Sequence, residues 1–427
     1  MPSDKEGSGE KQPLLNAQKR RLAFASTGES LIGKTGWSSI WIACLISFLC
    51  GASFALFLMS IWPFLLTLYP PVSTTFYSGV VASFSLGRGL SSPLFGYWSN
   101  RIRTVRSPII FGCALNLLGN LLYILAQLAT GGMAAPLVVL FGRLLMGIGG
   151  GVVPLTTAYA ATSAIEKDKP KAISLAMAAN VFGSGLGPGL QLAFTPLGNG
   201  YRIVGPIRFD MYTAPAITGA LAMMLAIMLM IFAFKEEYQG IQDDSDEIMP
   251  GQQLPKFSVT AILVILFAWF VSSCVITTLE AIASPYMMVM YNWDDQQSVT
   301  NSSAVFLMCA MICAVLFAVY SYTKLHDYDT RYFVTSGLAV LIVFHIATYP
   351  WPFYTGHIES TIKITPDELV PGCNNKYPWC LTMPQVPLAV LIVSYAVFFS
   401  VGMAETAAPL GVLYAAVIGP RRMVSEW

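Results

Sequence analysis

Charged residues are scarce in this chain of 427 residues. They make up 11% of it, against roughly 25% in soluble globular domains, while hydrophobic residues make up 55%. This composition excludes an ordinary water-soluble domain and indicates a chain solvated mainly by membrane lipid. The formal net charge of +1 gives no basis for binding nucleic acid, so we expect no nucleic-acid partner.

Catalytic signatures are also missing. The three histidines show no metal-ligand spacing, and no phosphate-binding loop, dinucleotide-binding glycine turn or nucleophile motif stands between a strand and a helix. We therefore expect no enzyme, no cofactor and no metal. The first 36 residues are polar and carry no signal peptide, so the first apolar run is expected to act as its own insertion signal.

Ten apolar runs long enough to cross a bilayer follow this polar tail. They cover residues 38–66, 74–98, 107–128, 135–160, 171–195, 212–234, 258–283, 303–323, 332–349 and 386–413. The connecting loops hold twelve basic residues on the side of the N-terminus and four on the other, which predicts a cytosolic N-terminus. The predicted fold class is an all-α polytopic membrane protein.

Two features on the predicted lumenal side agree with this orientation. Asn301 begins an Asn-Ser-Ser acceptor for N-glycosylation. Cys373 and Cys380 share one long loop, where an oxidising lumen permits a disulfide; a pair of free thiols is the alternative.

The order of the runs suggests two helical bundles. We expect a disordered cytosolic tail over residues 1–36, a six-helix bundle over 37–234, an acidic cytosolic loop over 235–257 and a second bundle over 258–427. This layout resembles the major facilitator superfamily, which has twelve spans. Because ten runs are present, we expect the second bundle to hold four helices and to be incomplete, as in a splice variant or a misannotated gene end.

Three segments resemble motifs of that superfamily. Gly96, Asn100 and Arg101 follow the second run, with Asn100 in place of the usual aspartate, which implies a weakened latch between the halves; a basic anchor is the alternative. Arg143, Gly147 and Gly151 stand in the fourth run. Gly183, Gly187 and Pro188 stand in the fifth, where Gly183 and Gly187 share one helix face and Gly185 and Gly189 another.

Ionisable residues inside the runs are the candidate transport path, because a charge in the bilayer is costly unless it serves a function. Arg143 lies about 12 Å from the lumenal end of its helix, at 1.5 Å per residue, which is deep for snorkelling. A structural arginine that binds backbone carbonyls is the alternative. Arg88, Glu280 and Glu405 are the other candidates, and each glutamate is either a protonation site or an interfacial group that reaches water.

The polar tail contains a candidate sorting signal. Glu10 is followed after three residues by Leu14 and Leu15. An acidic residue and two leucines at this spacing are typical of signals that clathrin adaptors bind, with the carboxylate on a basic patch and the leucines in an apolar pocket. We expect a clathrin adaptor as a partner, or else an incidental pair of leucines in a disordered tail.

Several short runs are more specific than these motifs. They are Val80–Gly87, Ser92–Gly96, Met211–Pro215, Gly372–Cys373, Trp379–Leu381 and Ile418–Pro420. Across roughly residues 37–420 the chain resembles the major facilitator superfamily domain-containing protein 8 family. The resemblance implies an endolysosomal, glycosylated, multi-span protein that moves a small solute or ion, with chloride conductance among its implied activities.

We therefore expect an endolysosomal transport protein for a small anion or solute. Arg143 is expected to face the anion, with Arg88 as a second candidate, and Glu280 and Glu405 are candidate proton or gating sites. The sequence leaves a chloride-permeable pathway and a proton-coupled carrier open. A shortened form that does not transport and regulates a longer sibling is the remaining alternative.

Overall fold

The computed structural model describes residues 35–129, 132–165, 168–204, 207–238, 258–322, 329–358, 360–361, 373–374 and 378–418. Glu10, Leu14 and Leu15 of the predicted sorting signal lie outside the described residues, as does most of the acidic central loop. Long apolar helices dominate what remains, because a chain in lipid must satisfy its backbone hydrogen bonds within each segment.

The first half of the chain forms one bundle. Its helices are α2 (Trp37–Ala55), α3 (Ile61–Leu68), α4 (Thr74–Ile102), α5 (Arg106–Leu125), α6 (Ala134–Gly150), α7 (Val153–Ser163), α8 (Lys169–Phe194) and α9 (Thr213–Met228). Short helical turns extend α5 over Ala126–Leu128, α8 over Thr195–Leu197 and α9 over Leu229–Ala233. An antiparallel hairpin of β1 (Tyr201–Val204) and β2 (Ile207–Phe209) connects α8 to α9.

The second half forms a smaller bundle. Its helices are α10 (Val259–Tyr291), α11 (Asp295–Tyr322), α12 (Thr330–Ala347), α13 (Leu388–Ser394) and α14 (Ser400–Ile418), with a π-helical turn at Tyr395–Phe399 joining the last two. The loop after α12 contains the short parallel strands β3 (Ser360–Thr361) and β4 (Cys373–Asn374) and a helical turn at Pro378–Leu381.

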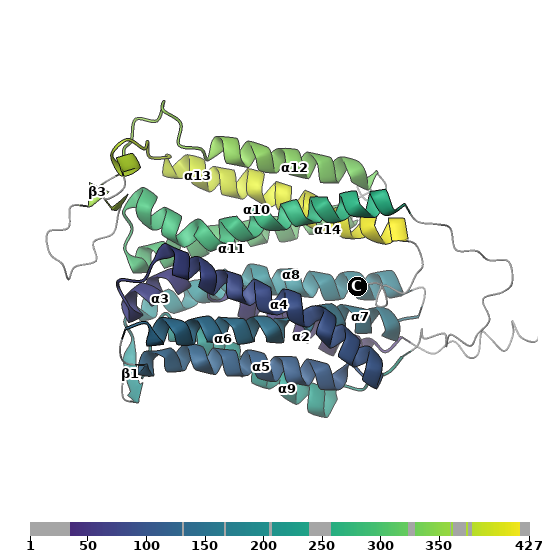
Figure 1. Cartoon of the computed structure of the whole chain (residues 1–427). Coiled ribbons are helices and arrows are strands. Elements are labelled where there is room, and N and C mark those ends of the chain that lie inside the picture. The colour runs from purple at the N-terminus through teal and green to yellow at the C-terminus, as the bar shows by residue number, and fades with distance from the viewer. Residues whose placement is uncertain are drawn as a thin grey trace, which may run out of the picture.

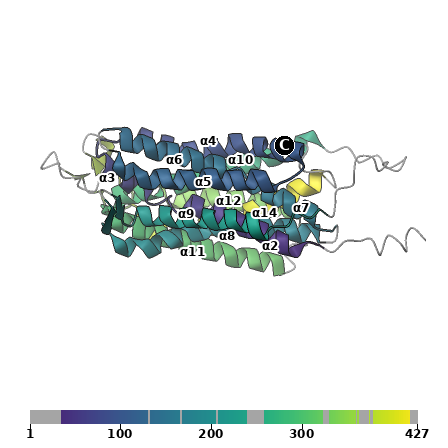
Figure 2. The same ribbon diagram turned by 90° about the horizontal axis from the view of Figure 1, so that it is seen from below.

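The helices coincide with the predicted runs. Within the described residues, nine helical segments are long and apolar enough to cross a membrane. Helix α4 is not among them, since its serines, glycines and Arg88 lower its hydropathy, yet its 29 residues run parallel to the others (Figures 1 and 2). The predicted all-α polytopic fold is confirmed.

The two bundles lie side by side with their helices along one common axis (Figure 1). Helix α8 of the first bundle packs along α11 of the second. The hairpin and the loop with Cys373 and Cys380 share one end of the molecule, at the left of Figure 1, which we call the disulfide end. Figure 2 shows the same arrangement from below.

Glycines allow the helices of the first bundle to approach closely. A Cβ atom added to Gly147 of α6 would lie 2.1 Å from the Phe84 carbonyl of α4, and one added to Gly149 would lie 2.4 Å from the Gly112 carbonyl of α5. Neighbouring backbones therefore touch α6 on both of these sides, as small residues permit in membrane bundles. This contact fixes how α6 presents its other residues.

Candidate functional site

Arg143 lies inside the first bundle with no exposed surface. It stands nine residues after the start of α6, or about 14 Å along the helix axis. The glycines on either side of it hold α6 against α4 and α5, so the arginine is fixed at this depth. The structure therefore buries the charge that the sequence marked as unusual.

Aromatic rings enclose the guanidinium. Its central carbon lies 4.8 Å from the ring centroid of Phe84 on α4 and 5.5 Å from that of Phe57. Its Nη1 atom lies 3.8 Å from the sulfur of Met146, one helical turn away. The Nε and Nη2 atoms are buried and have no hydrogen-bond partner.

These contacts do not offset the burial of the charge. A desolvated cation–π contact contributes about 2 kcal/mol. Taking an ion out of water costs several kcal/mol even after relaxation, and two buried donors without acceptors each add about 1–3 kcal/mol. Arg143 is therefore poorly satisfied by the described residues around it. The predicted alternative, in which it binds backbone carbonyls, is not what the structure shows.

Two tyrosines lie close to Arg143. The Tyr123 ring of α5 packs on Phe57, with centroids 4.7 Å apart, and both Tyr123 and Tyr77 are within electrostatic range of the guanidinium. The Tyr123 hydroxyl is buried without a completed hydrogen bond, although the Ser60 hydroxyl is close to it. A second donor thus accompanies the arginine.

A break in the first span positions Phe57. Helix α2 ends at Ala55 and α3 begins at Ile61, and the five residues between them are all buried. Discontinuous helices at mid-membrane commonly form substrate sites, because the break places groups that a continuous helix would direct elsewhere. Here the break directs an aromatic ring toward Arg143.

Arg88 lies at the middle of α4, one turn beyond Phe84, and is half-buried. A Cβ atom added to Gly150 would lie 3.4 Å from the tip of Phe84 and 3.9 Å from the Cδ atom of Arg88. Since Phe84 also contacts Arg143, the two arginines flank one aromatic side chain. They therefore belong to one region of the first bundle.

The two glutamates lie in the second bundle, away from Arg143 in sequence. Glu405 of α14 packs against Gly337 of α12, and its Oε2 atom is buried without a hydrogen-bond partner. Glu280 lies in α10 directly before Ala281, and its side chain is outside the described atoms. Among the described contacts, the Glu405 carboxylate does not meet the arginine.

Sequence reasoning missed a set of uncharged polar residues within the spans. Ser53 of α2 donates to Asn116 Oδ1 of α5 at 3.2 Å, and Asn120 donates to the same oxygen at 2.9 Å. On α8, Gln191 donates to the Met211 carbonyl at 2.9 Å. Asn116 and Asn120, four residues apart in an apolar run, are a signal of this network that is visible in the sequence.

The loop after α4 is held by a residue that the sequence did not single out. The Glu236 carboxylate, after α9, accepts hydrogen bonds from the Thr104 hydroxyl and, at 2.6 Å, from the Val105 backbone N–H at the start of α5. Asn100 of the predicted latch is exposed. Arg101 contacts the Tyr97 hydroxyl of its own helix at 3.4 Å. Glu236 therefore carries the loop contact seen in this conformer.

The glycines of α8 face two different partners. Cβ atoms added to Gly183 and Gly187 would lie 2.1 Å from the Phe48 carbonyl and 2.5 Å from Ala55 Cβ, both of the first span. Cβ atoms added to Gly185 and Gly189 would lie 2.8 Å from Ala310 Cβ and 2.7 Å from Leu307 Cδ1, both of α11. Glycines therefore line the contacts of α8 with its own bundle and with the other bundle. The helix continues through Pro188.

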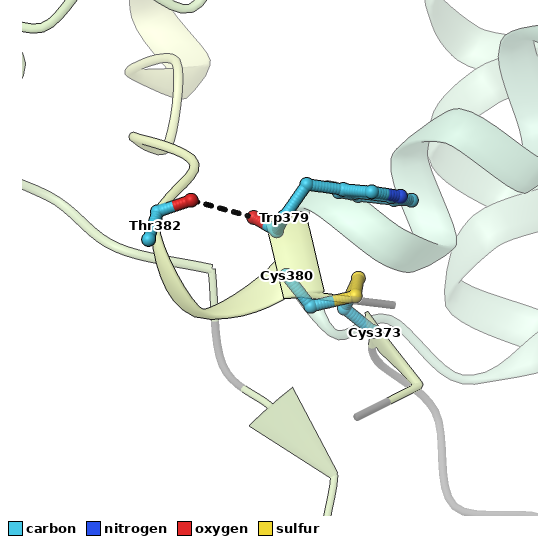
Figure 3. The surroundings of a disulfide bond; sticks show 4 residues. All are labelled: Cys373, Trp379, Cys380 and Thr382. Carbon is cyan, nitrogen blue, oxygen red and sulfur yellow. Dashed lines mark hydrogen bonds between the residues drawn. A yellow bond between two sulfur atoms is a disulfide. The ribbon is translucent and has the colours of Figure 1, made fainter. Parts of the chain in front are cut away.

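The structure joins Cys373 and Cys380 by a disulfide (Figure 3). Both cysteines are buried against the end of α10, where Met290 also packs. Asn301 lies half-buried in α11, and the hydroxyl of Ser303, which completes the glycosylation acceptor, is buried. Glycosylation of Asn301 stays a prediction.

Described contacts between the bundles concentrate toward the disulfide end. Tyr77 of α4 donates a hydrogen bond to the Ala281 carbonyl of α10, and Gln296 of α11 donates to the Thr195 carbonyl at 3.1 Å. One apolar cluster at this end combines Leu58 and Met59 with residues of α10 and α11. The clusters described toward the opposite end contain residues of one bundle only.

A sequence profile of the Major Facilitator Superfamily matches residues 43–423, which is most of the chain. The chain belongs to this superfamily. Membership agrees with the paired bundles and confirms the fold class predicted from the apolar runs. Superfamily members are membrane transporters, so the site around Arg143 lies in a transporter scaffold.

One relative within the superfamily matches nearly the whole of this chain. It is 28% identical, over 454 aligned residues, to Major facilitator superfamily domain-containing protein 8 of Xenopus laevis, covering 99% of this chain and 87% of that one. The resemblance drawn from the short sequence runs is thereby confirmed.

Two solved structures share the fold. An inward-open structure of the xylose transporter XylE from E. coli is 16% identical with a TM-score of 0.62, covering 91% of this chain and 84% of that one. An inward-facing, unoccupied bacterial homologue of the human lysosomal transporter Spinster is 14% identical with a TM-score of 0.59, covering 92% and 78%. At these identities the likeness shows the fold alone.

Proposed function

We propose that this transporter moves a small anion across an endolysosomal membrane and that Arg143 binds the anion. One observation carries the proposal: the Arg143 guanidinium is fully buried, yet two of its nitrogens have no hydrogen-bond partner. In a low-dielectric interior such a charge attracts anions strongly. Chloride and small organic anions both fit this description.

The conformer is compatible with alternating access. With the N-terminus in the cytosol, the disulfide end faces the lumen, and the contacts of Tyr77 and Gln296 close that side. The endolysosomal address itself is proposed from Glu10, Leu14 and Leu15. A clathrin adaptor remains the proposed partner for that address.

A recording on cells tests the proposal directly. Replacing Leu14 and Leu15 by alanine should send the protein to the plasma membrane, where anion-dependent current or uptake is measured with and without Arg143→Gln. Loss of a charged hydrogen-bond partner should lower the flux about tenfold or more. Arg202→Gln, at an exposed arginine of β1, is the matched control and should leave the flux unchanged.

Two results would count against the proposal. A double alanine variant that still reaches lysosomes would remove the proposed address. Equal flux for Arg143→Gln and the parent, with both at the surface, would remove Arg143 from the transport path.

A proton-coupled carrier is the second candidate. Glu405 supports it, because it is an ionisable residue within a membrane span whose Oε2 atom is buried without a hydrogen-bond partner. Imposing a pH gradient in the same recording distinguishes the candidates, since only a coupled carrier would accumulate its anion against a concentration gradient.

A further inference from the structure

Two free nitrogens of Arg143 lie on the same edge of the guanidinium. In this planar group the Nε–H and Nη2–H bonds are parallel and side by side, while Nη1 lies across from Nε. In this chain Nη1 contacts the Met146 sulfur at 3.8 Å, and Nε and Nη2 are buried without partners. The Nε and Nη2 atoms of the arginine therefore form a pair of parallel hydrogen-bond donors.

We propose that the anion bound at Arg143 is a monocarboxylate held through both of its oxygens; this rests on the transport function proposed above. Two parallel N–H donors match the two oxygens of a carboxylate, and this bidentate pairing is stronger and more directional than contact with a point charge. A chloride ion has one centre and cannot engage both donors along their axes. The free edge thus favours a carboxylate over chloride.

The surroundings suit a ligand with one charge and an apolar body. The ring centroids of Phe57 and Phe84 lie 5.5 and 4.8 Å from the central carbon of the guanidinium, so apolar ring surface surrounds the charge. Tyr123 adds a buried hydroxyl that can donate to a carboxylate oxygen. A phosphate monoester carries a charge of about −1.5 to −2 and would keep uncompensated charge beside a single arginine.

Arg143→Lys separates the effect of donor geometry from that of charge, because lysine keeps the positive charge but lacks the two parallel N–H donors. The full chain, purified in lipid nanodiscs, is titrated with acetate, butyrate, hexanoate and benzoate, and separately with chloride, while thermal unfolding is followed. We expect at least one carboxylate to raise the melting temperature of the parent. Arg143→Lys should weaken that carboxylate about tenfold or more and spare the response to chloride by comparison, because a single-centre ion does not need two parallel donors.

Tyr123→Phe is the second variant, since it removes one hydroxyl and retains the ring that packs on Phe57. It should weaken carboxylate binding about tenfold and also spare the response to chloride. Arg202→Lys, an exposed arginine of β1, is the control and should behave as the parent.

The outcomes separate this proposal from the transport function. If none of the four carboxylates protects the parent, or if Arg143→Lys binds them as the parent does, the carboxylate proposal is wrong. If Arg143→Gln alone loses anion binding while Arg143→Lys keeps it, the site takes anions by charge and the transport proposal stands. If Arg143→Gln also binds normally, both proposals fail.

Discussion

Glu236 is a single residue that connects two segments of the first bundle, the start of α5 and the chain after α9. Its carboxylate accepts from Thr104 and Val105 at the start of α5 and from the Tyr238 hydroxyl. A carboxylate that accepts a free N–H at a helix start also favours the positive end of the helix dipole. Glu236 therefore acts as a remote cap for α5.

The hydrogen bond that Tyr238 donates to Glu236 is insensitive to pH over the neutral range. Burial, and after it the hydrogen bond to Glu236, raise the pKa of Tyr238. The phenol therefore stays protonated as a donor, and its contribution to stability is complete below a pH of about 10, the usual pKa of tyrosine. That contribution is lost only as the pH rises above this value.

Replacing Glu236 by alanine should loosen the start of α5. We expect hydrogen exchange at the Val105 amide to accelerate about tenfold or more, because a charged hydrogen bond is worth about 1.5–3 kcal/mol. Glu237→Ala is the matched control, since its side chain is exposed. Unchanged exchange in Glu236→Ala would show that the loop is held without the carboxylate.

The sequence identified Arg143 because a charge within an apolar run is visible in one dimension. It did not identify Phe57, Tyr123 or Glu236. Aromatic residues are ordinary in membrane helices, and two partners of Glu236, Thr104 and Val105, lie more than 130 positions away in the chain. Roles that depend on contacts between distant segments are not encoded in a local pattern.

At the scale of elements, glycine spacing decides how α4, α5 and α6 pack. Backbone contact at Gly147 leaves no room for a methyl group, since the Phe84 carbonyl would lie 2.1 Å away. Phe84 also contacts Arg143, so a shift at this point reaches the candidate site.

Gly147→Ala should destabilise the first bundle by about 1–3 kcal/mol, the usual cost of overpacking. Thermal unfolding in detergent, followed by size-exclusion chromatography, measures the effect. Gly79→Ala on α4 is the control: an added Cβ there meets nothing within 4 Å, and alanine favours helix. Equal melting temperatures for the two variants would mean that α4 and α6 can separate freely.

The helices themselves were predictable and their interruptions were not. Each apolar run became helical, as one helix or as two consecutive ones, because lipid leaves the backbone no other way to satisfy its hydrogen bonds. The break between Ala55 and Ile61 lies inside one continuous apolar run, where neither glycine nor proline occurs between the two helices. It depends on packing against the other spans, which sequence alone does not reveal.

For the whole molecule, the sequence predicted two bundles but could not predict which end is closed. Closure depends on contacts such as Tyr77 with Ala281, which are 204 positions apart. In this conformer the bundles meet toward the disulfide end, and the described clusters at the other end stay within one bundle.

Tyr77→Phe should favour opening at the disulfide end. One neutral hydrogen bond contributes about 0.5–1.5 kcal/mol, so the open population should rise about 2- to 10-fold. Spin labels at the exposed Thr75 and Gln297 would report the distance between the bundles. Ser78→Ala is the control, because Ser78 bonds only within its own helix at 3.0 Å. An identical distance distribution in Tyr77→Phe would assign closure to the apolar cluster instead.

The complete enclosure of Arg143 also limits speed. An anion reaches a residue with no exposed surface only after helices have moved, and collective motions of this size take microseconds to milliseconds. Under the proposed function, each anion bound at Arg143 must wait for one such motion, so the turnover number has a ceiling of about 10³–10⁶ per second. Flux through this site should therefore level off at high anion concentration and rise steeply with temperature.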